Sequence, residues 1–404
     1  MARSASAMGL VMVTDALRRG CAAALLVLTA GAVQAADIRI INGDTPGEGL
    51  NDTTPRDPVP GNPGTTVGAQ RLNALGYVAD LLGSRIGSDV PILVEVTFSN
   101  LRCRSTNADL AAAGPERLVS DFPGAQPGVF YALALANAIN GARIESGPDI
   151  SADFNADLDA PDDCLGGADW YYGLDNNPPG DDLNFVSTAT HELIHGLGFA
   201  SFVNLQTGEF FMGLPSIYET FIRDLGFSTT WPSLNNNERM ASAANDGNVV
   251  WDGPSITPQV SARYSDGTVG SDLQLYAPNP VEPGSSISHW EADLTPNALM
   301  EPFVDARGDV DIRNGIGLAA CVLSDLGWGL INRVGCPDDD GAAIPSPDGT
   351  ADGSGNANAG GGSGDMAGDD GSGGGGCTLG RGAPDPIWLA LLLVAAWRLR
   401  RQSI

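Results

Sequence analysis

One segment constrains the fold of this 404-residue chain more than any other, residues 186–197. Asp182 or Asn184 can cap the start of a helix there, and Gly198 can end it in a left-handed turn. Apolar residues then recur at helical spacing, at Val186, Ala189, Leu193 and Leu197. We therefore predict a helix with one buried face.

The other side of this helix carries the sequence His191-Glu192-Leu-Ile-His195. Two histidines at positions i and i+4 lie about 6 Å apart along a helix axis and project from the same face, so both imidazoles can bind one ion. Zinc suits neutral imidazole and an open tetrahedral site, and it lowers the pKa of a bound water towards ~7. Glu192 can take the proton of that water as a general base.

A catalytic zinc ion needs a third protein ligand. The compact arrangement would place a histidine at position 201, where this chain has Ser201. The chain has three histidines in all, so His289 is the remaining imidazole. A glutamate on a following helix is the alternative third ligand, and Glu219 is the available candidate for that gluzincin-type arrangement.

Four motifs together resemble a known family, the leishmanolysin-type metzincins. They are a His-Glu-x-x-His-x-x-Gly-Phe motif at 191–199, a long insertion before His289, the turn-like Leu-Met-Glu-Pro at 299–302, and Ser-Asp-Leu-Gly-Trp at 324–328. The resemblance covers roughly residues 185–330. Two features depart from the family: no cysteine-switch propeptide is apparent, and cysteines are fewer.

The resemblance implies a fold and a ligand set. It implies an α+β zinc endopeptidase, with a mixed sheet and the active-site helix in an N-terminal lobe and a largely irregular or helical C-terminal lobe. Zinc would bind His191, His195 and His289, with Glu192 as general base. Met300 would form a structural turn beneath the metal. Protein or peptide substrates follow from the same resemblance.

The N-terminal end of the sequence predicts export. Residues 1–35 combine Arg18 and Arg19 with an apolar stretch and a small-residue cleavage site, as a secretory signal peptide does. The expected mature metallopeptidase domain is 36–336, with lobes of about 36–198 and 199–336.

The C-terminal end resembles the tripartite sorting tags of Gram-negative bacteria. Residues 337–376 contain 14 Gly and 8 Asp and predict a disordered acidic linker. In the tag, 377–404, Cys377 precedes a 12-residue apolar run at 386–397 and an arginine cluster. That run is shorter than the ~20 residues of a comfortable membrane span, which favours a transient transmembrane helix over a permanent anchor. We expect a surface or extracellular location, transient membrane association and a sorting protease as partner.

Four cysteines remain for the folded domain, and an even number in an exported domain favours two disulfides. Three pairings are possible. The pairing with the shortest loops, Cys103–Cys164 with Cys321–Cys336, is our prediction.

Alternating helical and strand patterns predict an α+β domain. We expect strands at 37–41 and 91–98, a half-exposed strand at 153–159, and helices at 69–86 and 131–139. The helix at 69–86 should bury an apolar face formed by Leu72, Leu75, Val78, Ala79, Leu82 and Ile86.

The formal net charge of −28 argues against nucleic acid and anionic lipid as partners, because phosphate binding needs a clustered basic surface. Calcium is compatible with 49 acidic residues, although no loop matches a calcium site. Besides a zinc endopeptidase, the sequence leaves open a non-catalytic surface binding or adhesion protein on the same fold.

Overall fold

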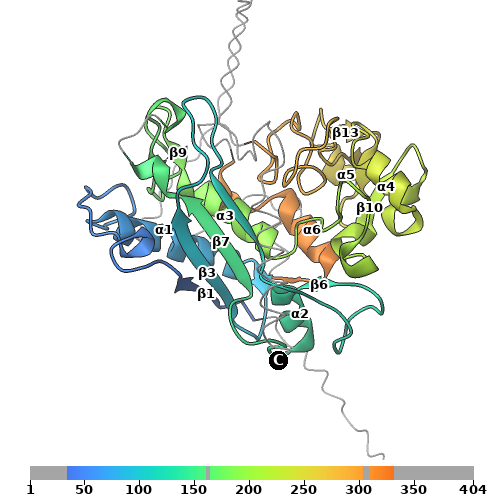
Figure 1. The fold of residues 1–404 in the computed structure, drawn as a ribbon, viewed down its shortest axis with the longest axis horizontal. Coiled ribbons are helices and arrows are strands. Elements are labelled where there is room, and N and C mark those ends of the chain that lie inside the picture. The colour runs from blue at the N-terminus through green and yellow to red at the C-terminus, as the bar shows by residue number, and fades with distance from the viewer. Residues whose placement is uncertain (1–33, 161–163, 304–309, 332–404) are drawn as a thin grey trace, which may run out of the picture. The chain divides into compact units, whose positions relative to one another are not determined.

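The computed structural model describes residues 34–160, 164–303 and 310–331 (Figure 1). Most of the predicted signal peptide, the acidic linker and the sorting tag lie outside these ranges. The predicted domain boundaries and the role of Cys377 therefore stay predictions.

A mixed four-stranded sheet lies at the centre of the N-terminal part (Figure 1). Its order is β1-β3-β7-β4; the first two neighbouring pairs are parallel, and β4 runs antiparallel to β7. Side chains of β3 alternate between buried and half-buried, as its pattern of Val and Phe requires. The strands are β1 Ile38–Asn42, β3 Ile92–Ser99, β4 Ala111–Pro115 and β7 Ile150–Asn155.

Two long helices pack against this sheet and against each other, α1 (Val67–Gly83) and α3 (Phe185–Gly196). The predicted buried face of the first is wrong at one position: the side chain of Leu72 is 49% exposed. Its neighbour Arg71 is buried instead, because its guanidinium is paired with Asp159 at 2.7 Å. The prediction also ran past the end of this helix, since Ile86 belongs to the short strand β2 (Ile86–Gly87).

Two other predicted elements are shorter than expected. The helix expected at 131–139 is α2 (Leu133–Asn140), preceded by the short strand β6 (Tyr131–Ala132). The strand expected at 153–159 ends at Asn155, where a 3₁₀ turn (Ala156–Asp159) begins. Asn155 causes the change because its side chain accepts the amide of Asp157, which satisfies the backbone locally.

The chain after α3 forms small sheets and short helices around an aromatic core. Its three-stranded antiparallel sheet has the order β11-β10-β12. The core includes the fully buried Trp231, Trp251 and Trp290. The elements are β10 Ile222–Asp224, β11 Thr229–Thr230, β12 Val249–Trp251, β13 Thr268–Val269, β14 Asp272–Leu273, β15 Gly329–Leu330, α4 Asn236–Ser242, α5 Pro258–Ser261 and α6 Leu318–Leu326. Three further two-residue strands precede α3 in the chain, namely β5 Leu118–Val119, β8 Trp170–Tyr171 and β9 Leu183–Asn184.

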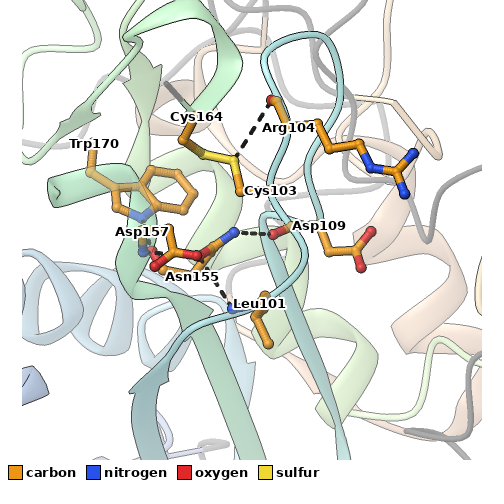
Figure 2. The surroundings of a disulfide bond; sticks show 8 residues. All are labelled: Leu101, Cys103, Arg104, Asp109, Asn155, Asp157, Cys164 and Trp170. Atoms are coloured by element: carbon orange, nitrogen blue, oxygen red, sulfur yellow. Dashed lines mark hydrogen bonds between the residues drawn. A yellow bond between two sulfur atoms is a disulfide. The ribbon is translucent and has the colours of Figure 1, made fainter. Parts of the chain in front are cut away.

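The predicted disulfide between Cys103 and Cys164 is confirmed (Figure 2). Next to it, Asn155 receives the amide of Leu101, and its carbonyl accepts the indole N–H of Trp170. The disulfide and this asparagine therefore join the same two loops, the one that follows β3 and the one that follows β7. Of the second predicted pair, Cys321 takes part in a disulfide bond, and Cys336 lies outside the described residues.

A buried polar cluster fixes the start of α1 to the segment after β7. The carboxylate of Asp159 forms salt bridges with Arg71 and Arg56, and it accepts a hydrogen bond from the hydroxyl of Tyr172 at 2.6 Å. A buried carboxylate is tolerated when it is paired and hydrogen-bonded in this way.

Among the helices of the described ranges, none is long and apolar enough to cross a lipid bilayer. The apolar run predicted at 386–397 is outside those ranges.

Candidate metal centre

Helix α3 begins and ends as its sequence predicts. Of the two proposed caps, Asn184 is the one used, and its side chain accepts the amide of Ser187 at 3.2 Å. Gly198 has φ +115°, so the chain leaves the helix through a conformation that glycine adopts without strain. All twelve residues of the helix are buried, so its polar face is covered by protein.

The structure brings together His191, His195 and His289. The Nε2 atoms of His191 and His195 are 3.0 Å apart, and each lies 3.1 Å from the Nε2 atom of His289. All three side chains are buried, and they form a group of ligand atoms that could hold a metal ion.

A backbone carbonyl fixes the tautomer of each ring. Nδ1 of His191 lies 2.6 Å from the carbonyl oxygen of Leu299, that of His195 lies 2.7 Å from Phe199, and that of His289 lies 2.8 Å from Ser285. A carbonyl oxygen can only accept, so each Nδ1 carries the proton and donates it. In a neutral imidazole the lone pair is then on Nε2, which is the atom directed at the other two rings.

Burial also keeps these imidazoles neutral. It lowers the pKa of His191 to about 3 and that of His195 to about 4. The pKa of His289 is lowered well below its ordinary value, first by burial and then by the other two rings. Three neutral nitrogens with converging lone pairs form a donor set for a cation.

The separations of the donor atoms fit zinc. At Zn–N distances of about 2.0–2.1 Å and tetrahedral angles, two ligand nitrogens lie about 3.3 Å apart. The observed 3.0–3.1 Å is within a few tenths of an ångström of that spacing. Without an ion between them, three lone pairs at this distance would repel one another.

Glu192 lies beside this group in the sequence and is 3% exposed. Burial raises the pKa of its carboxyl to about 8, and a hydrogen bond from the backbone amide of Ala113 opposes that rise. Ala113 belongs to β4, which packs against α3. Glu192 therefore belongs to the helix that packs against the edge strand of the sheet.

Glu219, the rival third ligand, is outside the three-histidine group. One of its carboxylate oxygens accepts the amide of Phe202 at 2.6 Å and the hydroxyl of Ser201, and the other accepts the amide of Ser216 at 2.6 Å. Both oxygens are thus engaged in holding two loops together. Glu219 therefore has a structural role, and it does not act as the third ligand that the gluzincin-type alternative requires.

Met300 is completely buried, in a turn whose Leu299 carbonyl contacts His191. The amide of Glu301 donates to the carbonyl of Ala298, and the carboxylate of Glu301 accepts the amide of Ala298. This double closure orients the carbonyl of Leu299 towards His191. The predicted turn is present, and its contact to the histidine is a main-chain carbonyl.

The loop that carries His289 contains a strained residue. Ile287 has φ +70°, a left-handed conformation that costs a β-branched residue about 1–3 kcal/mol. Its amide donates to the carbonyl of Tyr276 at 2.7 Å, and the amide of Tyr276 donates to the carbonyl of His289 at 3.0 Å. These bonds hold the loop in the shape that turns the His289 ring back onto Ser285.

Sequence reasoning missed the residues that orient the ligands. The indole N–H of Trp328 donates to the carbonyl of Leu197 at 2.9 Å, at the end of α3. Trp328 belonged to a recognised motif, so its position was a usable signal. The carbonyls of Phe199, Ser285 and Leu299 left no such signal, because any residue supplies one.

Comparisons with protein-family models, curated proteins and solved structures found no match for this chain. What the structure supports is an α+β fold with a mixed sheet and a buried three-histidine group suited to a metal ion such as zinc.

Proposed function

We propose that this chain is an exported zinc-dependent endopeptidase of the leishmanolysin-type metzincin kind. The observation that carries the proposal is the convergence of three Nε2 atoms at 3.0–3.1 Å, each with its Nδ1 proton committed to a backbone carbonyl. His191, His195 and His289 would hold the ion. Bound zinc supplies Lewis-acid chemistry, acidifying a water molecule and polarising a substrate carbonyl.

Glu192 supplies the proton transfers in this proposal. Its carboxylate accepts a proton from the attacking water and returns it to the nitrogen of the departing amine. Beside a bound dication the Glu192 carboxylate would be favoured in its ionised form, which is the form that acts as a base.

Strand β4 supports a peptide as substrate. Within the described residues it pairs only with β7, so its outer edge retains unpaired backbone groups. Strand β4 also packs against helix α3, which carries the proposed base Glu192. An extended peptide that added to this edge would lie along the site, with main-chain bonds that do not depend on its sequence.

Export is part of the proposal. The Cys103–Cys164 disulfide is consistent with folding in an oxidising compartment. Surface sorting and a processing protease as partner remain expectations from the sequence.

Metal analysis and peptidase assays on the purified full-length chain test the proposal. We expect about one zinc per chain, lost or strongly weakened in His289→Ala, and hydrolysis of a broad peptide library. Glu192→Gln should keep the zinc and lose peptide hydrolysis, because it removes the base without removing a ligand. Full activity in that variant would contradict the mechanism, and zinc binding without any hydrolysis in the wild type would favour the non-catalytic binding protein.

A further inference from the structure

Side chains that bind no metal themselves join two segments that contact or carry the histidine ligands. One segment is the turn after α3, residues 197–201, whose Phe199 carbonyl holds His195. The other is the loop 285–289, which carries His289. The side chains of Tyr218 and Ser288 bridge these segments.

Tyr218 touches both sides. Its hydroxyl donates to the carbonyl of Ile287 at 2.8 Å, and its ring packs against that of Phe199 with centroids 5.4 Å apart. The side chain is completely buried and also contacts Trp251, so its ring is fixed independently of the loop. The hydroxyl therefore attaches the strained residue of the loop to a rigid aromatic core.

Ser288 forms the second bridge. Its hydroxyl oxygen accepts the backbone amide of Ser201 at 3.1 Å, two residues beyond Phe199. Ser201 is held in turn, since its own hydroxyl donates to the buried carboxylate of Glu219. The bond thus links the residue directly before His289 to the turn that follows α3.

We infer that Tyr218 and Ser288 are metal-positioning residues, whose hydroxyls set the separation between His195 and His289. The left-handed conformation at Ile287 makes this necessary, because a strained loop relaxes unless its surroundings hold it. Relaxation would move the third imidazole away from the other two. The inference rests on the proposed metal site and adds to it the residues that keep its geometry.

Zinc affinity tests this inference directly. The full-length chain and its variants Tyr218→Phe and Ser288→Ala would be titrated with zinc against a chromophoric chelator. We expect the Kd of each variant to rise about tenfold, at the lower end of the effect of losing groups that orient metal ligands. Tyr218→Phe retains the packed ring. If Tyr218→Phe does not fold, the Kd of Ser288→Ala tests the inference instead.

Tyr172→Phe is the matched control. It also removes a buried tyrosine hydroxyl, which donates to Asp159 and lies in the polar cluster at α1. Its Tm should fall while its zinc Kd stays at the wild-type value. Cobalt substitution gives a second readout, because the visible absorption of bound cobalt reports ligand geometry and should change in the two variants only.

Wild-type Kd values and an unchanged cobalt spectrum in both variants would overturn the inference and leave the metal site intact. An equal loss of affinity in Tyr172→Phe would overturn it as well, because the effect would then be one of general stability. A wild-type chain that binds no zinc would refute the proposed function itself.

Discussion

Replacing Glu219 by alanine separates the structural role of this carboxylate from the ligand role that the sequence allowed. The side chain is completely buried and accepts two backbone amides at 2.6 Å and one hydroxyl. A buried amide left without an acceptor costs about 1–3 kcal/mol, so losing two costs about 2–6 kcal/mol. Phe202 is half-buried, and burial raises the pKa of Glu219, which marks a cost of holding the charge. Both effects reduce the expected loss of unfolding free energy to near the lower end of that range, about 2 kcal/mol.

We therefore expect Glu219→Ala to lower the free energy of unfolding by about 2 kcal/mol. For a domain of this size that corresponds to a fall in Tm of about 4 °C or more, at roughly 2–4 °C per kcal/mol. Zinc per chain should stay at the wild-type value, because the carboxylate is outside the three-histidine group. Calorimetry and elemental analysis on the same preparation measure both quantities.

A matched variant is Glu238→Ala, which removes a half-buried glutamate from the capping box of α4. Its Tm should fall less, since the amide it frees is exposed to water. The reasoning is refuted if Glu219→Ala keeps the wild-type Tm, or if it folds normally and has lost its zinc.

Three further outcomes are expected. Zinc removal by a chelator should lower the free energy of unfolding by about 4 kcal/mol relative to zinc at a thousandfold excess over Kd, and His289→Ala should lack this response in calorimetry. Replacing both Cys103 and Cys164 by serine should cost about 4 kcal/mol in urea titrations, because the bond spans 61 residues and restricts the unfolded chain. Burial raises the pKa of Asp153 beside Asp44, so the native state retains this proton to higher pH than the unfolded chain does. The resulting stability is present below about pH 4 and is lost as pH rises through the native pKa; Asp153→Asn should therefore match the wild type there and have a higher Tm at pH 7. A lower Tm at pH 7 would contradict this sign.

The sequence was sufficient for the site because its chemistry depends on few residues. The spacing of His191 and His195 on a helix is a local property, and the helix forms where its apolar stripe predicts. His289 followed from composition, since the chain has a single further histidine. The structure places all three imidazoles together.

The parts that sequence reasoning could not reach depend on distant partners. Arg71 is buried and Leu72 exposed because Asp159, 88 residues further along, neutralises the guanidinium. A local pattern of polar and apolar residues cannot contain that information. The left-handed conformation at Ile287 is equally hidden, because isoleucine is among the residues least expected to adopt it.

The wide spacing of the ligands along the chain sets an order of assembly. His289 lies 94 residues after His195, so the donor set is incomplete until nearly the whole domain has been synthesised and has closed around its aromatic core. In the unfolded chain only the two helix histidines are close together in sequence, so metal capture is coupled to completion of the fold. For the zinc-dependent hydrolysis that we propose, this coupling means that activity begins only after the fold is complete.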